Sequence, residues 1–128
     1  MASQPGTRNL SLALTLVGLI FVFGIYPLTL VWPSGWSWDP PQPEYLQMIL
    51  GIYVTLGIFL LRAARNPLRH LSLIWFTVWS SLVHAGIMAV HSFRDPVERG
   101  HLVGDVAALV IVAVLLAAVT PSSTPDAG

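Results

Sequence analysis

Three of the four histidines and three of the six acidic residues gather in one short stretch of the chain, residues 84–105. Its sequence is HAGIMAVHSFRDPVERGHLVGD, and most of its other residues are apolar. Imidazole nitrogens and carboxylate oxygens can bind a metal ion, pass protons or hold a polar ligand by hydrogen bonds. This stretch is therefore where we expect a functional site.

The spacing within this stretch predicts two pairs of facing side chains on a helical hairpin. Only the two residues 94–95 separate its apolar segments, so the helices on either side are expected to be antiparallel neighbours. With the turn centred there, His91 lies level with Glu98, and His84 lies level with Asp105. The pairs are seven residues apart on each helix, so they form two layers about 10 Å apart on one face.

The inner pair is the stronger candidate for a site, because Asp105 is predicted to lie inside the apolar layer. A lone charge there costs at least about 2.5–3.5 kcal/mol on insertion scales, so the carboxylate needs a partner or a wet cavity. His84 and His101 are its natural partners, although polar contacts of this kind also occur simply as links between helices. The outer pair has a plainer interpretation, since Glu98 can cap its own helix.

Three kinds of chemistry are compatible with these residues. His84, His101 and Asp105 supply the nitrogen and oxygen ligands that zinc, iron or copper accepts, which makes a divalent metal one candidate cofactor. Haem is a second candidate, if His101 lies opposite His84 or His91. A ladder of imidazoles and carboxylates can also relay protons or bind a polar ligand head. The candidate ligand-binding residues are His84, His91, Glu98, His101 and Asp105.

The composition indicates an integral membrane protein. Hydrophobic residues make up 55% of the 128-residue chain and charged residues 9%, whereas a soluble domain carries about 25% charged residues. Four apolar runs are each close to the roughly 20 residues that a helix needs to cross a membrane. We therefore expect an all-α, antiparallel four-helix bundle that forms one transmembrane domain over residues 1–128, with short disordered tails. The predicted spans are residues 10–32, 44–62, 67–93 and 96–119.

Proline and capping residues predict where the helices begin. Asn66 and Pro67 have the pattern of an N-cap followed by proline at the first position of the third helix. Asp95, with Glu98 three residues later, approaches a capping box at the start of the fourth helix. Pro27 is expected to kink the first helix near its end.

A loop rich in tryptophan and proline, residues 32–43, follows the first helix. Its aromatic side chains fit a belt at one membrane–water boundary, and a lid over the bundle is the alternative. Gly51 and Thr55 on the second helix are expected to form a small-residue packing face. Three further polar residues are candidates to line a cavity beside the inner pair: Tyr26, Thr29 and Gln47.

Arginine predicts the orientation of the bundle, because the chain has no lysine. Four of the six arginines lie in the N-terminal segment and in the connection between the second and third helices, residues 62–69. The positive-inside rule therefore places both termini and this connection in the cytoplasm. We expect the protein in the inner membrane of a bacterial cell.

The segment from the third helix through ERGHLVGD resembles a family of small four-span bacterial membrane proteins with no assigned function. The resemblance covers about the C-terminal half of the chain. It implies the four-helix fold and supplies no activity. The residues that carry it are His84, Glu98, Gly100, His101, Leu102, Gly104 and Asp105.

The leading function hypothesis is binding of a small ligand or metal ion in an outer-leaflet pocket between the third and fourth helices. The alternative is a non-catalytic accessory or structural subunit of a larger membrane complex. A third hypothesis is a membrane oxidoreductase or proton-coupled carrier, and the residues leave open whether any reaction is catalysed. The expected partners are the lipid bilayer and either further copies of the chain or a larger complex. The absence of cysteine excludes thiolate chemistry, and no basic run suggests a nucleic-acid partner.

Overall fold

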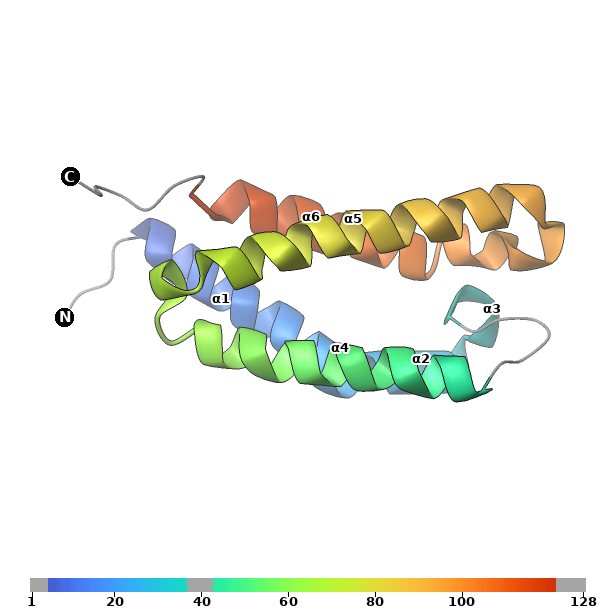
Figure 1. The fold of residues 1–128 in the computed structure, drawn as a ribbon, viewed down its shortest axis with the longest axis horizontal. Coiled ribbons are helices and arrows are strands. Elements are labelled where there is room, and N and C mark those ends of the chain that lie inside the picture. Colours follow the sequence, from blue (N-terminus) through green and yellow to red (C-terminus); the bar gives the residue numbers. More distant parts are fainter. Residues whose placement is uncertain (1–4, 37–42, 122–128) are drawn as a thin grey trace.

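Four long helices run antiparallel along one axis (Figure 1). The computed structural model describes residues 5–36 and 43–121, and every regular element within these ranges is helical. Residues 1–4, 37–42 and 122–128 lie outside the described residues. Residues 5–8, which were predicted to belong to a disordered N-terminal tail, are part of the first helix, so that part of the prediction is wrong. Four stretches are long and apolar enough to cross a membrane, which confirms the predicted all-α, four-span fold. These stretches are Thr7–Val31, Glu44–Ala63, Leu71–Arg94 and Pro96–Val119.

The first span contains a π-helical turn shortly before its proline. It consists of α1 (Pro5–Leu19), the π-helix η1 (Ile20–Gly24) and α2 (Ile25–Val31). Pro27 has no N–H to donate, and its ring crowds the carbonyl four residues earlier, which lies within η1. A π turn opens the hydrogen-bond ladder at this point. The irregularity expected from Pro27 therefore takes the form of a π turn.

The third span begins later than predicted. After α4 (Pro43–Ala63), a separate 3-10 turn forms η2 (Pro67–Arg69), and α5 (Leu71–Arg94) starts only beyond it. Asn66 and Pro67 therefore begin η2 and not the long helix, so the predicted start of the span at residue 67 is wrong. Proline at a first position suits both kinds of helix, which is why the sequence signal did not distinguish them.

The fourth span begins in two steps. Oδ1 of Asp95 accepts a hydrogen bond from the backbone N–H of Val97 at 3.0 Å, and this cap starts the 3-10 helix η3 (Pro96–Leu102). The chain then turns, and α6 occupies Asp105–Val119. Asp95 is a cap as predicted, whereas the continuous α-helix expected from residue 96 is wrong. Because a 3-10 helix rises about 2.0 Å per residue instead of 1.5 Å, seven such residues carry Asp105 about 3.5 Å farther from the turn.

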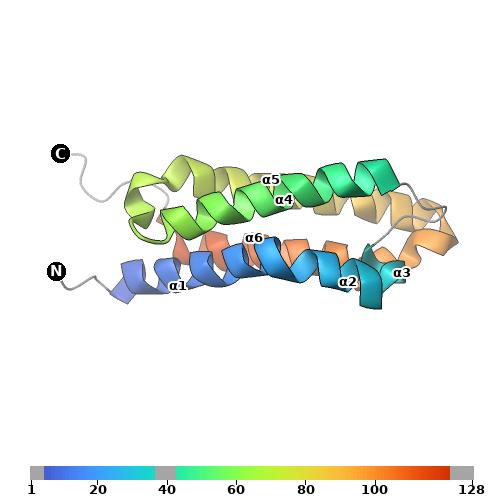
Figure 2. The same cartoon turned by 90° about the horizontal axis from the view of Figure 1, so that it is seen from below.

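The helix α1 lies against both α4 and α6, and α5 packs along α6 (Figure 2). Gly18 and Gly57 allow α1 and α4 to approach closely. A Cβ on Gly18 would lie 3.0 Å from the carbonyl oxygen of Gly57, and a Cβ on Gly57 would lie 2.9 Å from that of Gly18. Gly51 and Thr55 are exposed, so they do not pack against another helix of this bundle as predicted. The largest fully buried aliphatic side chains are Leu10, Leu14, Val17, Leu60, Ile74 and Leu116.

A four-residue helix, α3 (Pro33–Trp36), packs against η3 at the end of the bundle opposite the two termini (Figure 1). Glycine permits this contact. A Cβ on Gly104 would overlap the carbonyl oxygen of Gly35, and a Cβ on Gly100 would overlap that of Ser34. The contact fixes the start of the tryptophan loop over the His-rich hairpin.

Candidate functional site

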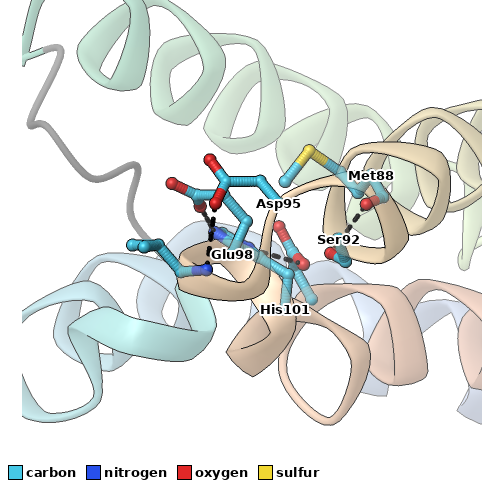
Figure 3. A network of polar contacts seen from close by, with 7 residues as sticks. Met88, Ser92, Asp95, Glu98 and His101 are labelled. Atoms are coloured by element: carbon cyan, nitrogen blue, oxygen red, sulfur yellow. Dashed lines mark hydrogen bonds and ion pairs between the residues drawn. The ribbon is translucent and has the colours of Figure 1, made fainter.

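A buried imidazole lies between two buried carboxylates at the start of the fourth span (Figure 3). Nε2 of His101 is 3.0 Å from Oε2 of Glu98, and Nδ1 is 3.0 Å from Oδ1 of Asp105. The three residues are 1%, 4% and 8% exposed, respectively. We call this group the acid–histidine triad. Both ring nitrogens of its histidine are therefore engaged.

Local helix geometry produces this arrangement. Glu98 and His101 are three residues apart within η3, and side chains at that spacing eclipse one another in a 3-10 helix. Asp105 is the first residue of α6, where the positive end of the helix dipole favours a carboxylate. It lies one turn after His101, so its side chain reaches back to the ring.

If both contacts of His101 are hydrogen bonds, the triad contains two protons. An imidazole donates from both nitrogens only when it is protonated. Alternatively, the ring is neutral and one of the two acids is protonated. The ring then donates to the carboxylate and accepts from the carboxylic acid. Both arrangements contain two protons and have a net charge of −1. The buried triad therefore disfavours an anion beside it.

His84 is held by a residue of a different helix. The hydroxyl of Tyr53, on α4, is 2.9 Å from Nδ1 of His84, on α5. The Tyr53 ring also packs edge-on against Phe21, with the ring centroids 5.0 Å apart. Sequence reasoning did not single out Tyr53, although a phenol in the middle of an apolar span needs a hydrogen-bond partner and was a usable signal.

A cavity of about 50 Å³ lies beside the triad. About 10–15 Å³ of such volume holds one water, so the cavity has room for a few atoms of a ligand or several waters. Its polar lining comes from α2, α3, α4, α5, η3 and α6, and the rest of its wall is apolar. The lining residues are Ile25, Thr29, Trp36, Leu46, Ile49, Leu50, Tyr53, His84, Met88, His101, Asp105 and Leu109.

Trp36, which lines this cavity, has a buried indole N–H. Nε1 of Trp36 is buried and has no hydrogen-bond partner within residues 5–36 and 43–121. An unsatisfied buried N–H costs roughly 1–3 kcal/mol, so such a group is a place where a ligand or water is expected. The position of Trp36 at this cavity is compatible with the alternative that the tryptophan loop acts as a lid over the bundle.

The structure brings together His84, His101 and Asp105, all of which line the cavity. Asp105 makes its hydrogen bond to His101, whereas His84 bonds Tyr53. The two residues of the outer predicted pair are not among the cavity's lining residues: Glu98 contacts His101, and the side chain of His91 is exposed. Of the three additional polar candidates, Thr29 lines the cavity, while Tyr26 and Gln47 are exposed.

A family model described as "Family of unknown function (DUF6632)" matches residues 5–125, nearly the whole chain. The chain belongs to this family. No curated protein and no solved structure matches it. Membership in DUF6632 extends the resemblance seen in the C-terminal half to all four helices. The family has no assigned function, so membership in DUF6632 gives no information on the chemistry of the site.

Metal binding receives no geometric support in this DUF6632 protein. Among the described residues, no group of three or more histidine, aspartate or glutamate side chains is placed to hold a metal ion. Both nitrogens of His101 already face carboxylate oxygens at 3.0 Å, so ligation of a divalent metal or of haem iron would first break one of these contacts.

Proposed function

We propose that this membrane protein binds a small uncharged ligand by hydrogen bonds in the cavity beside the acid–histidine triad. The observation that carries the proposal is that Trp36 and Asp105 line the same cavity, and that the buried Nε1 of Trp36 has no hydrogen-bond partner among the described residues. Buried polar groups in folded proteins almost always have partners. A ligand that accepts from the indole N–H and donates to the carboxylate would give Trp36 its missing partner and would give Asp105 a second partner beside His101.

A hydroxyl group fits these requirements best. It accepts and donates through one oxygen atom, so it can bond Trp36 and Asp105 together. A carboxylate ligand would satisfy the indole but would meet the negative triad. An ammonium ligand would satisfy Asp105 but has no acceptor for the indole.

The accessory-subunit hypothesis has weaker support. Large apolar side chains are exposed on all four spans, as expected for any helix surface in contact with lipid. This exposure does not distinguish a protein partner from the bilayer.

Binding in the cavity is tested with 1-butanol and protein containing 5-fluorotryptophan in lipid nanodiscs. We expect a saturable shift of the Trp36 ¹⁹F resonance, which is assigned by its loss in Trp36→Phe. Asp105→Asn should weaken this response about tenfold or more, because it removes a charged acceptor and keeps the shape. The matched control is Glu44→Gln, which changes an exposed acid at the start of α4. An unchanged titration in Asp105→Asn would contradict the proposal, as would the absence of a saturable shift.

We also propose a bacterial inner-membrane location with both termini in the cytoplasm. The proposal is supported by the exposed arginines at one end of the bundle, which come from the start of α1 and from the α4–α5 connection. The opposite end, with α3 and η3, would then face outward.

The orientation is tested with single cysteines, because the natural chain has none. Val97→Cys lies on η3 and Asn66→Cys lies beside η2, and both positions are exposed. A membrane-impermeant maleimide added to spheroplasts should label the cysteine at residue 97. It should label the one at residue 66 only after the membrane is permeabilised. The reverse pattern would contradict this orientation.

A further inference from the structure

The helices α4 and α5 leave an apolar seam between them. α4 packs against α1 and η1, whereas α4 and α5 are not among the closely packed pairs of elements. In the most apolar stretch of each span, 17% is buried for α4 and 33% for each of the other three spans. One face of α4 is therefore without a protein neighbour within the described residues.

Two grooves occupy this seam, with volumes of about 640 Å³ and 580 Å³. Their walls come from α4 and α5 alone and are almost entirely apolar. On α5 they extend from Leu73 to Met88, which corresponds to roughly 22 Å at 1.5 Å per residue. This length covers most of a hydrocarbon layer about 30 Å thick.

The second groove lies next to the cavity beside the triad, and the two share part of their walls. Ile49, His84 and Met88 line both of them. The Tyr53–His84 hydrogen bond joins α4 to α5 at this position. These shared side chains separate the groove from the cavity, so a molecule in the groove would reach the cavity only if the side chain of His84 moved aside.

We propose that the ligand of the cavity is a membrane amphiphile with a hydroxyl head on a hydrocarbon chain, which reaches the site sideways between α4 and α5. This inference rests on the proposed function and adds the tail and the route. The head bonds Trp36 and Asp105, and the chain lies in the groove. The hydrogen bond between Tyr53 and His84 has to loosen as the head passes.

Photolabelling of the protein in phosphatidylcholine nanodiscs tests the route. The probe is 1-dodecanol carrying a diazirine near the middle of its chain, and the adducts are mapped by mass spectrometry. We expect adducts concentrated on the groove face of α4 and α5, and their loss when excess 1-dodecanol is added. Dodecanoate and dodecylamine should compete much less well. Equal competition by dodecanoate would overturn the assignment of the head.

A matched pair of variants separates the groove from ordinary lipid surface. Val83 lines the groove on α5 and is 60% exposed, whereas Val114 on α6 is 61% exposed and is not a groove residue. Val83→Trp should reduce specific adducts by roughly tenfold, because it displaces a few methylene groups of the chain. Val114→Trp should leave them unchanged. A retained 1-butanol shift at Trp36 in Val83→Trp shows that the cavity is intact.

The outcomes distinguish the two proposals. Adducts spread evenly over all four helices, or equal labelling of the two tryptophan variants, would overturn the lateral route. If the 1-butanol shift is still present in that case, the proposed function survives alone. If the wild-type protein shows no 1-butanol shift, the proposed function fails, and this inference fails with it.

Discussion

His101→Ala is expected to lower the free energy of unfolding by about 3–5 kcal/mol, the usual cost of leaving a buried charge without its partner. The substitution removes both ring nitrogens and leaves Glu98 and Asp105 buried near each other with no imidazole between them. The measurement is equilibrium unfolding in mixed micelles titrated with sodium dodecyl sulfate. His91→Ala is the control, because His91 is exposed on α5, and we expect an effect within about 0.5 kcal/mol.

A second substitution separates charge from packing in this experiment. Adding Glu98→Gln to His101→Ala removes one of the two buried acids and should recover part of the lost stability. If the loss came only from the missing ring volume, the added glutamine would recover nothing. Equal effects of His101→Ala and His91→Ala would contradict the triad as a stabilising unit.

The four spans could be predicted from the sequence because their signal is strong and local. A run of about 20 apolar residues satisfies its own backbone only as a helix in lipid, so length and composition are sufficient. The start of the third span, and the type of helix with which the fourth span begins, could not be predicted so well. Pro67 and Pro96 indicate a helical start but not whether the first turn is 3-10 or α.

The site was harder to predict because it depends on which helices meet. The spacing along the chain predicted that His84, His101 and Asp105 lie close together, and these residues line one cavity. Tyr53 and Trp36 come from other segments, and their position depends on how α4 and α3 pack. Sequence periodicity carries the local pairing of His101 with Asp105, but no information on packing between distant segments.

The packing of α3 against η3 also joins segments that lie far apart in the sequence. Gly104→Ala is expected to lower the free energy of unfolding by about 1–3 kcal/mol, the usual cost of overpacking a close contact. The new methyl group would overlap the backbone oxygen of Gly35, which no side-chain rotation can relieve. Gly86→Ala is the control, because nothing lies within 4 Å of a Cβ there, and alanine in a helix should add up to about 1 kcal/mol.

Gly100→Ala separates the contact from helix capping. Gly104 is also the N-cap of α6, where alanine is less favourable than glycine, whereas Gly100 lies inside η3 and touches Ser34. Both alanines should lift α3 and expose Trp36, which acrylamide quenching of a variant with Trp36 as its sole tryptophan would detect. Unchanged quenching in both would mean that α3 does not depend on these glycines. Because the proposed site uses the indole N–H of Trp36, loss of this contact should weaken 1-butanol binding even though neither glycine belongs to that site.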